Sequence, residues 1–196
     1  MQVRDEQRLR EELVEYGKKL LASGLVQGTW GNLSTRLSDS EMLVTPSGMD
    51  YERILPENIV KVDIETLQYE GDLKPTSECS LHAAIYQMSP DAGAVIHTHS
   101  KYCSIFAAAR MPLQVESKEK QRELGEIIRC AEYGLAGTKT LRDNTCRALG
   151  SAAGCLMAAH GMICRGADLE DAFRKCRLME EAAEESIERR IKQNAG

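Results

Sequence analysis

The 196-residue sequence predicts an α/β fold in which helices pack against a largely antiparallel sheet. Two amphipathic helical patterns lie near the ends of the chain, at about residues 6–22 and 168–193. Between them, short apolar runs with β-branched residues alternate with turn residues, as is typical of strands joined by hairpins. No internal repeat or low-complexity linker interrupts this pattern, so we expect one domain over residues 1–196.

The first half of the chain predicts a helix, a series of strands and a second helix. Four leucines form the apolar stripe of the helix at residues 6–22, and Gly24 ends it. Strands bounded by turn residues are expected within residues 28–37 and at 42–45, 59–63 and 66–69. The pattern of residues 78–88 is helical, and the hydroxyls of Thr76 and Ser77 are suited to cap that helix.

The second half opens with an apolar strand at residues 94–99. The elements expected next are a helix at 102–109, a charge-dense solvated stretch at 114–125, a strand at 127–131, a loop at 132–138 and a helix at 140–149. Residues 155–166 predict two strands, or one long strand, around His160. Asp168 can cap the long helix that follows.

Composition excludes several classes of protein. The formal net charge is -5, so the chain has no general attraction for nucleic acid or for anionic lipid. Seven cysteines form an odd number with no Cys-x-x-Cys pair, which favours a reducing compartment. Residues 1–6 contain no apolar signal core and no run approaches a membrane span, so we expect a cytoplasmic protein.

Three of the four histidines and one glutamate stand in positions that could form a metal site. His97 and His99 are spaced i, i+2 at the end of a predicted strand, which points both imidazoles to one face. Glu78 and His82 are spaced i, i+4 in a helical pattern, and His160 follows an apolar run. Three histidines and a carboxylate are the ligands of a catalytic zinc centre. A single histidine is more often a surface or core residue, so the local pattern leaves both interpretations open.

Two loops and one helix start carry groups that are suited to bind phosphate. Residues 28–32 and 45–48 combine glycines with hydroxyls, and such loops can present backbone N–H groups to an anion. Thr76 and Ser77 stand before the helix that begins near Glu78, where free N–H groups favour an anion. Taken singly, each feature also fits a plain turn or cap.

Five motifs, taken in this order, resemble the class II aldolase/adducin-head family. They are Gly28-Thr29-x-Gly31-Asn32-x-Ser34-x-Arg36, Thr45-Pro46-Ser47-Gly48, Lys74-Pro75-Thr76-Ser77-Glu78-x-x-x-His82, His97-Thr98-His99-Ser100 and His160-Gly161. The resemblance runs from the first helix to the last. It implies the three-layer α/β/α sandwich of that family, assembled as a homotetramer with active sites at subunit interfaces.

The resemblance also implies a role for each site residue. The implied metal ligands are Glu78, His97, His99 and His160, around one zinc ion per subunit. This donor set also accepts other divalent transition metals. Glu78 would move aside to act as acid and base, whereas His82 matches a structural position. The implied phosphate-binding residues are Thr29, Asn32, Ser47, Gly48, Thr76 and Ser77.

The function implied is that of a metal-dependent class II aldolase. Such an enzyme cleaves a ketose 1-phosphate, similar to L-fuculose 1-phosphate, to dihydroxyacetone phosphate and an aldehyde, with zinc stabilising an enediolate. The alternatives are a sugar-phosphate dehydratase or a 4-epimerase on the same metal site, or a non-catalytic scaffold similar to the adducin head. The chain retains all three histidines and the glutamate, which favours an enzyme.

Two departures from the family pattern predict a different aldehyde product. Residues 112–121 lack the tyrosine that serves in proton transfer, and the family's C-terminal tail, with a second active-site tyrosine, has no counterpart before Gly196. Tyr133 lies in residues 130–138, which resemble a family loop near the site. Its ring either packs that loop or takes part in the chemistry.

Overall fold

The structure, a computed structural model, describes residues 5–194, so the expectations for residues 1–4 and 195–196 lie outside the described residues. The helices are α1 (Glu6–Ala22), η1 (Pro56–Asn58, a 3-10 turn), α2 (Cys79–Met88), α3 (Lys101–Ala109), α4 (Lys118–Leu124), α5 (Lys139–Leu149) and α6 (Leu169–Asn194). The strands are β1 (Asn32–Arg36), β2 (Glu41–Val44), β3 (Val60–Asp63), β4 (Ala94–Thr98), β5 (Leu113–Gln114), β6 (Ile127–Ile128), β7 (Cys130–Ala131), β8 (Gly154–Met157) and β9 (Gly161–Gly166). No helix within the described range has both the length and the apolar character needed to cross a membrane.

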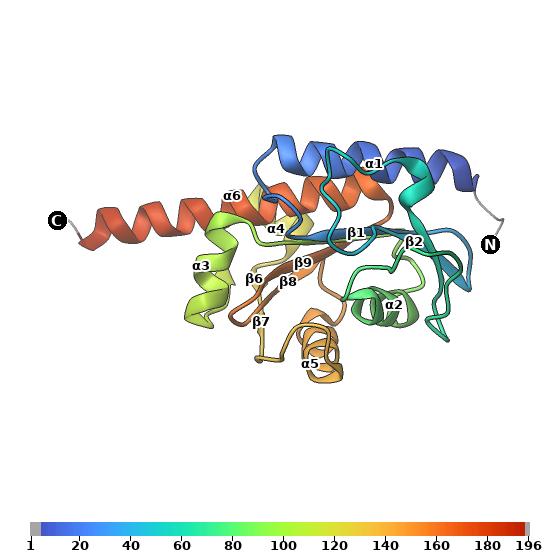
Figure 1. The fold of residues 1–196 in the computed structure, drawn as a ribbon. Coiled ribbons are helices and arrows are strands. Elements are labelled where there is room, and N and C mark those ends of the chain that lie inside the picture. Colours follow the sequence, from blue (N-terminus) through green and yellow to red (C-terminus); the bar gives the residue numbers. More distant parts are fainter. Residues whose placement is uncertain (1–4, 195–196) are drawn as a thin grey trace.

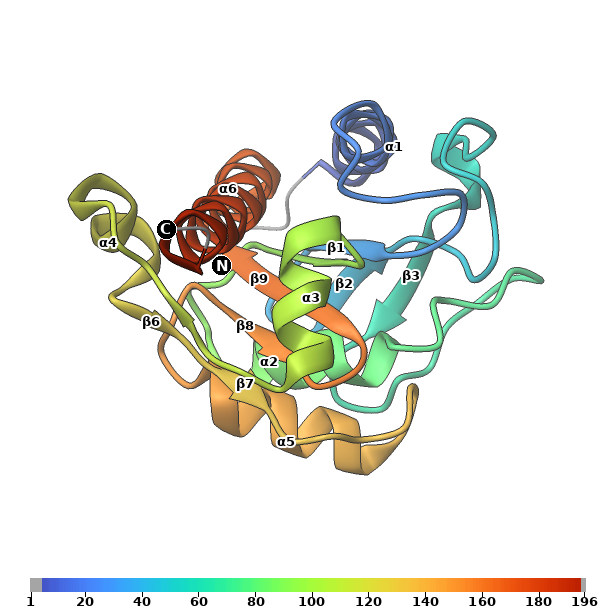
Figure 2. The ribbon, with the colours of Figure 1, turned by 90° about the vertical axis from the view of Figure 1, so that its left-hand side faces the viewer.

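The main sheet confirms the predicted fold class. Its order is β3-β2-β1-β4-β9-β8-β7, and every neighbouring pair is antiparallel except the parallel pair β7 and β8. Helices α1, α3 and α6 cover one face, and α2 and α5 cover the other (Figures 1 and 2). The molecule is therefore a three-layer α/β/α sandwich.

Alternation along the strands decides which residues reach the site. Leu33 and Ile96 pack with α1 and α6 in one buried cluster, whereas Val95 packs with α2 and α5 in the other. His97 shares the face of Val95 and pairs in register with Asn32 on the neighbouring strand. The side of the sheet that α2 covers therefore holds both polar side chains.

The strand predicted at residues 66–69 does not form, although the chain turns back beside β3 as expected. After a tight turn, an isolated antiparallel bridge joins Val62 and Tyr69, and the Asp63 N–H donates to the Gln68 carbonyl (2.9 Å). In that turn the carboxylate of Asp63 accepts hydrogen bonds from the backbone N–H groups of Glu65 (3.0 Å) and Thr66 (2.7 Å). The local side-chain bonds satisfy backbone donors that a longer ladder would otherwise use.

Two further stretches differ from the expected elements. The charge-dense residues 114–125 include α4. Ser117 caps the N-terminus of this helix, because its hydroxyl accepts a hydrogen bond from the Lys120 N–H (3.4 Å). Leu124 is its buried residue, so the helix has too narrow an apolar stripe for the pattern to reveal it. The strand predicted at 127–131 is divided into β6 and β7, which belong to different sheets.

Candidate active site

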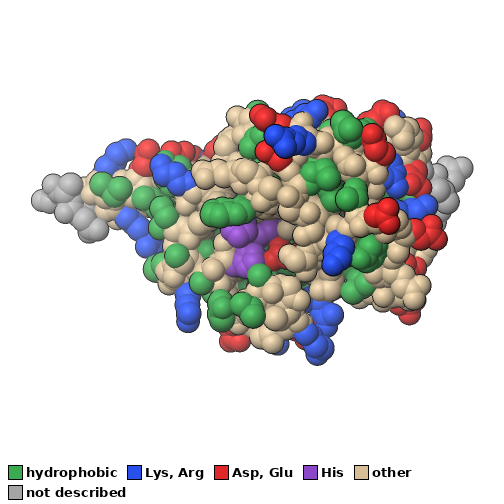
Figure 3. Space-filling view, viewed as in Figure 1, with side chains coloured by type: hydrophobic (Ala, Val, Ile, Leu, Met, Phe, Trp, Pro, Cys, Tyr) green, Lys and Arg blue, Asp and Glu red, His purple; other side chains and the backbone are tan. Residues whose placement is uncertain are grey.

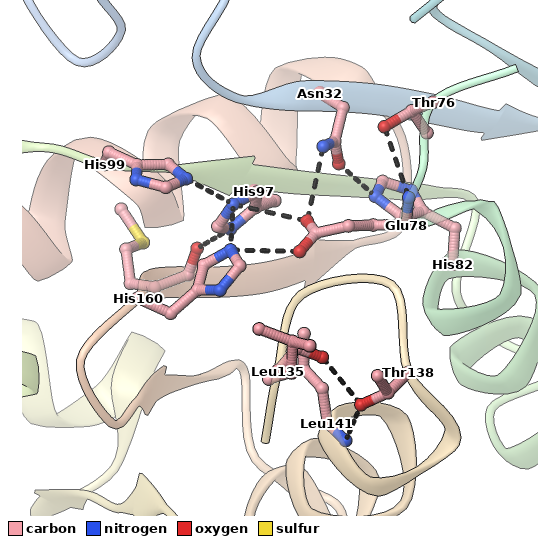
Figure 4. Close-up of polar contacts among 11 residues, drawn as sticks. Asn32, Thr76, Glu78, His82, His97, His99, Leu135, Thr138, Leu141 and His160 are labelled. Atoms are coloured by element: carbon pink, nitrogen blue, oxygen red, sulfur yellow. Dashed lines mark hydrogen bonds and ion pairs between the residues drawn. The ribbon is translucent and has the colours of Figure 1, made fainter. Parts of the chain in front are cut away.

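Three imidazoles converge at one end of a pocket on the edge of the sheet (Figure 4). The His97 Nε2 atom lies 2.9 Å from His99 Nε2 and 3.2 Å from His160 Nε2. His97 is in β4, His99 stands one residue beyond its end, and His160 belongs to the turn between β8 and β9. The predicted convergence of the histidines is therefore correct, although only one of them is in a strand.

Two glycines allow the loops to approach β4. A Cβ atom at Gly161 would lie 2.3 Å from the carbonyl oxygen of Thr98, well inside contact distance. Gly31 has φ +115°, and a Cβ atom there would lie 2.8 Å from the carbonyl oxygen of His97. His160 and the loop before β1 can reach the histidine strand only because these two positions have no side chain.

The donor set fits a divalent metal ion. His97 Nδ1 donates to the backbone carbonyl of Met162 (2.8 Å), which leaves Nε2 unprotonated and facing the other two rings. Burial lowers the pKa of His97 to about 4 and also lowers the pKa of His99, so both are neutral at pH 7, the form that binds metal. A tetrahedral zinc ion, with Zn–N near 2.0–2.1 Å, places its ligand nitrogens about 3.3 Å apart, close to the observed spacing.

Glu78 lies beside these nitrogens at the start of α2. It is buried, with Oε1 2.9 Å from His160 Nε2 and Oε2 3.3 Å from His97 Nε2. The Asn32 side-chain amide donates to Oε2 (3.3 Å). Burial raises the pKa of Glu78, but its contacts with these three side chains outweigh that effect and hold the pKa well below its usual range. An ionised carboxylate therefore lies beside the Nε2 atoms of His97 and His160.

The pocket next to these residues has a volume of about 210 Å³. All ten predicted ligand and phosphate-binding residues line it: Thr29, Asn32, Ser47, Gly48, Thr76, Ser77, Glu78, His97, His99 and His160. A bridge between Pro46 and Pro75 brings the loop at residues 45–48 against the segment that leads into α2. None of the described residues that line the pocket is lysine or arginine, so hydroxyl and backbone N–H groups are the donors it offers to an anion.

The surface around the pocket is hollowed and partly apolar. Figure 3 shows histidine side chains at the base of a hollow, with an acidic side chain beside them and hydrophobic side chains on its rim. Trp30 is 64% exposed, and its ring centroid lies 6.1 Å from that of His99. Ala136 also lines the pocket, whereas Tyr133, from the same loop, does not.

Sequence reasoning missed the apolar part of this lining, which consists of Trp30, Met49, Tyr51, Ile54 and Ala136. The position of Trp30 inside the motif 28–32 was the available signal. His82 lies outside the pocket and is fully buried, and burial lowers its pKa to about 3.

Comparison with known proteins gives one family. The family model for the class II aldolase and adducin N-terminal domain matches residues 11–187. A 5-deoxy-D-ribulose 1-phosphate aldolase of Bacillus thuringiensis serovar kurstaki is 35% identical over 168 residues, which cover 85% of this chain and 78% of the relative. A 5-methylthioribulose-1-phosphate/5-deoxyribulose-1-phosphate aldolase of Rhodospirillum rubrum is 35% identical over 177 residues, 90% of this chain and 79% of the relative.

A solved structure agrees with both the sequence match and the fold. An L-fuculose 1-phosphate aldolase superposes with a TM-score of 0.89 at 34% identity, covering 96% of this chain and 88% of the other. These similarities to aldolases over most of the chain identify an enzyme of the lyase class. The chain belongs to the class II aldolase and adducin N-terminal domain family.

Proposed function

We propose that this protein is a metal-dependent aldolase that cleaves a ketose 1-phosphate to dihydroxyacetone phosphate and an aldehyde. The observation that carries the proposal is the convergence of His97, His99, His160 and Glu78 on a pocket that also contains two phosphate-type loops. The relatives are named for 5-deoxyribulose 1-phosphate and L-fuculose 1-phosphate. Both sugars share the three-carbon, phosphate-bearing half that such a pocket would recognise.

The proposed cofactor is zinc, one ion per subunit, held by the three histidines and, before substrate enters, by Glu78. A zinc ion bound there would act as a Lewis acid toward the carbonyl oxygen of the ketose. The hydroxyls and backbone groups of the two loops and of the start of α2 would anchor the phosphate; these residues are Thr29, Asn32, Ser47, Gly48, Thr76 and Ser77.

Glu78 is the proposed acid and base. Its carboxylate faces the same space as the histidine nitrogens, and it is almost completely removed from water. As the carbon–carbon bond breaks, the hydroxyl that becomes the aldehyde loses one proton, and the three-carbon fragment takes up one. Glu78 would carry that proton, and in the reverse direction would remove it.

We propose a single domain over residues 1–196 that forms a cytoplasmic homotetramer with active sites at subunit interfaces. Trp30 and Leu135 support that arrangement, because they are 64% and 65% exposed beside the site and a neighbouring subunit would cover them.

The function is tested with purified, zinc-loaded protein and a panel of L-fuculose, 5-deoxyribulose and 5-methylthioribulose 1-phosphates. We expect at least one substrate to yield equal amounts of dihydroxyacetone phosphate and aldehyde. Zinc-loaded protein that releases neither product would refute the aldolase. NMR of the same mixtures would then detect a dehydratase by loss of water from the sugar, or a 4-epimerase by inversion at C4. A protein that binds no stoichiometric metal would be a scaffold.

A further inference from the structure

A continuous line of buried polar contacts leads away from Glu78 into the core. The Glu78 carboxylate contacts Asn32 Nδ2 (3.3 Å), and Asn32 Oδ1 lies 2.6 Å from His82 Nε2. The other ring nitrogen of His82 lies 2.7 Å from Ser34 Oγ, which in turn lies 2.8 Å from the Tyr86 hydroxyl. All five side chains are at most 6% exposed, so water does not compete for these contacts. Figure 4 shows the part nearest the pocket.

The charge at one end fixes the direction of every hydrogen bond. A carboxylate only accepts, so the Asn32 atom that faces Glu78 is the amide nitrogen and the atom that faces His82 is the oxygen. His82 must then carry its proton on Nε2, which leaves Nδ1 as an acceptor for the Ser34 hydroxyl. The Tyr86 hydroxyl therefore donates to Ser34. One tautomer and one amide orientation satisfy all members.

We propose that His82 is a positioning residue that acts through Asn32 to hold the Glu78 carboxylate in its orientation toward the histidine cluster. The inference rests on the proposed function for the role of Glu78 in proton transfer. His82 stands one turn after Glu78 on α2, and its ring spans the distance to the Asn32 amide on β1. It does not line the pocket, so it influences the reaction only through its neighbours.

Removal of the His82 N–H would release the orientation of the amide. An amide turned by 180° would place Asn32 Oδ1 against Glu78 Oε2, where two acceptors repel each other. Glu78 would then leave its position beside His97 and His160. Of the residues proposed to anchor the phosphate, only Asn32 belongs to this line of contacts, so the turnover number should fall much more than the affinity for substrate.

The kinetic test compares His82→Leu with His82→Gln, whose side-chain amide can still donate to Asn32. Loss of an outer partner of this kind typically costs about 10–100-fold. We expect His82→Leu to lower kcat by that factor, with a much smaller change in KM and unchanged zinc content, and His82→Gln to recover most of the lost kcat. Thr35→Val is the matched control. Thr35 is buried on β1, the strand that also carries Asn32 and Ser34, but its hydroxyl donates to the Gly93 carbonyl (3.0 Å) and not to His82. Full kcat in His82→Leu, or equal losses in both His82 variants, would overturn the proposal.

A second measurement needs no activity. Nitrogen-15 NMR of the imidazole rings, with the His82 signals assigned by their loss in His82→Gln, reports which nitrogen carries the proton. The proposal predicts Nε2–H, and an Nδ1–H tautomer would overturn it even if His82→Leu did not fold. Failure of this inference can be distinguished from failure of the proposed function. An inactive wild-type protein would refute the proposed function, whereas the NMR result tests the series of hydrogen bonds from Glu78 to Tyr86 without any assay of activity.

Discussion

Glu78→Gln tests the chemistry most specifically, because glutamine has the same shape but cannot take up a proton. In the wild-type protein, Glu78 Oε2 accepts a hydrogen bond from Asn32 Nδ2 (3.3 Å). The glutamine side chain keeps an oxygen that can accept the same bond. The three histidines remain as metal ligands. We therefore expect Glu78→Gln to fold and to bind zinc at one ion per chain.

The expected loss of turnover follows from the role of the carboxylate. A positioned acid or base contributes about 10²–10⁴-fold, which corresponds to about 2.7–5.4 kcal/mol of activation free energy. The assay measures dihydroxyacetone phosphate release at saturating substrate, with zinc content measured on the same sample. Glu132→Gln is the control, because Glu132 is 83% exposed and lies 4.0 Å from its partner Arg147. A zinc-loaded Glu78→Gln with unimpaired kcat would remove Glu78 from the mechanism.

Three further predictions concern stability and the metal site. Buried His82 and His97 have pKa values of about 3 and 4 against 6.5 when unfolded, so only the unfolded chain gains protons as pH falls. Metal-free protein should lose about 2 kcal/mol per histidine by pH 5, as measured by urea unfolding; unchanged stability would contradict these pKa values. Trp30 is the single tryptophan and lies near His99, so Co²⁺ should quench its fluorescence saturably in wild-type protein and not in His99→Ala. Quenching that never saturates would argue against a site. Gly161→Ala should destabilise the fold by about 1–3 kcal/mol and weaken zinc binding, because its Cβ would lie 2.3 Å from Thr98 O. An unchanged thermal unfolding curve would show that the turn can move.

The fold was predictable wherever periodicity was strong. The long helices have complete apolar stripes, and the strand at 94–99 is an apolar run whose alternation places His97 on the α2 face. The two-residue strand β5 and the division of residues 127–131 between two sheets could not be predicted, because so short a strand shows no periodicity and its pairing with β6 joins residues distant in sequence.

The site was predictable to the extent that its residues lie in local motifs. The positions of Glu78 and the three histidines follow from spacing and family resemblance, and all of them line the pocket. The partners of His82 could not be predicted, because Asn32 and Ser34 are about 50 residues away in sequence and meet its ring only when β1 packs on α2. The apolar wall formed by Trp30 and Ala136 likewise depends on two loops meeting.

The central claim is that the histidine cluster holds a metal ion required for carbon–carbon bond cleavage. The most direct measurement is dihydroxyacetone phosphate release by chelator-treated protein, before and after zinc is restored, with His99→Ala treated in parallel. We predict that wild-type protein loses activity on chelation and recovers it with one zinc ion per chain, and that His99→Ala recovers neither zinc nor activity. Full activity in thoroughly metal-free protein, or in His99→Ala, would contradict the claim.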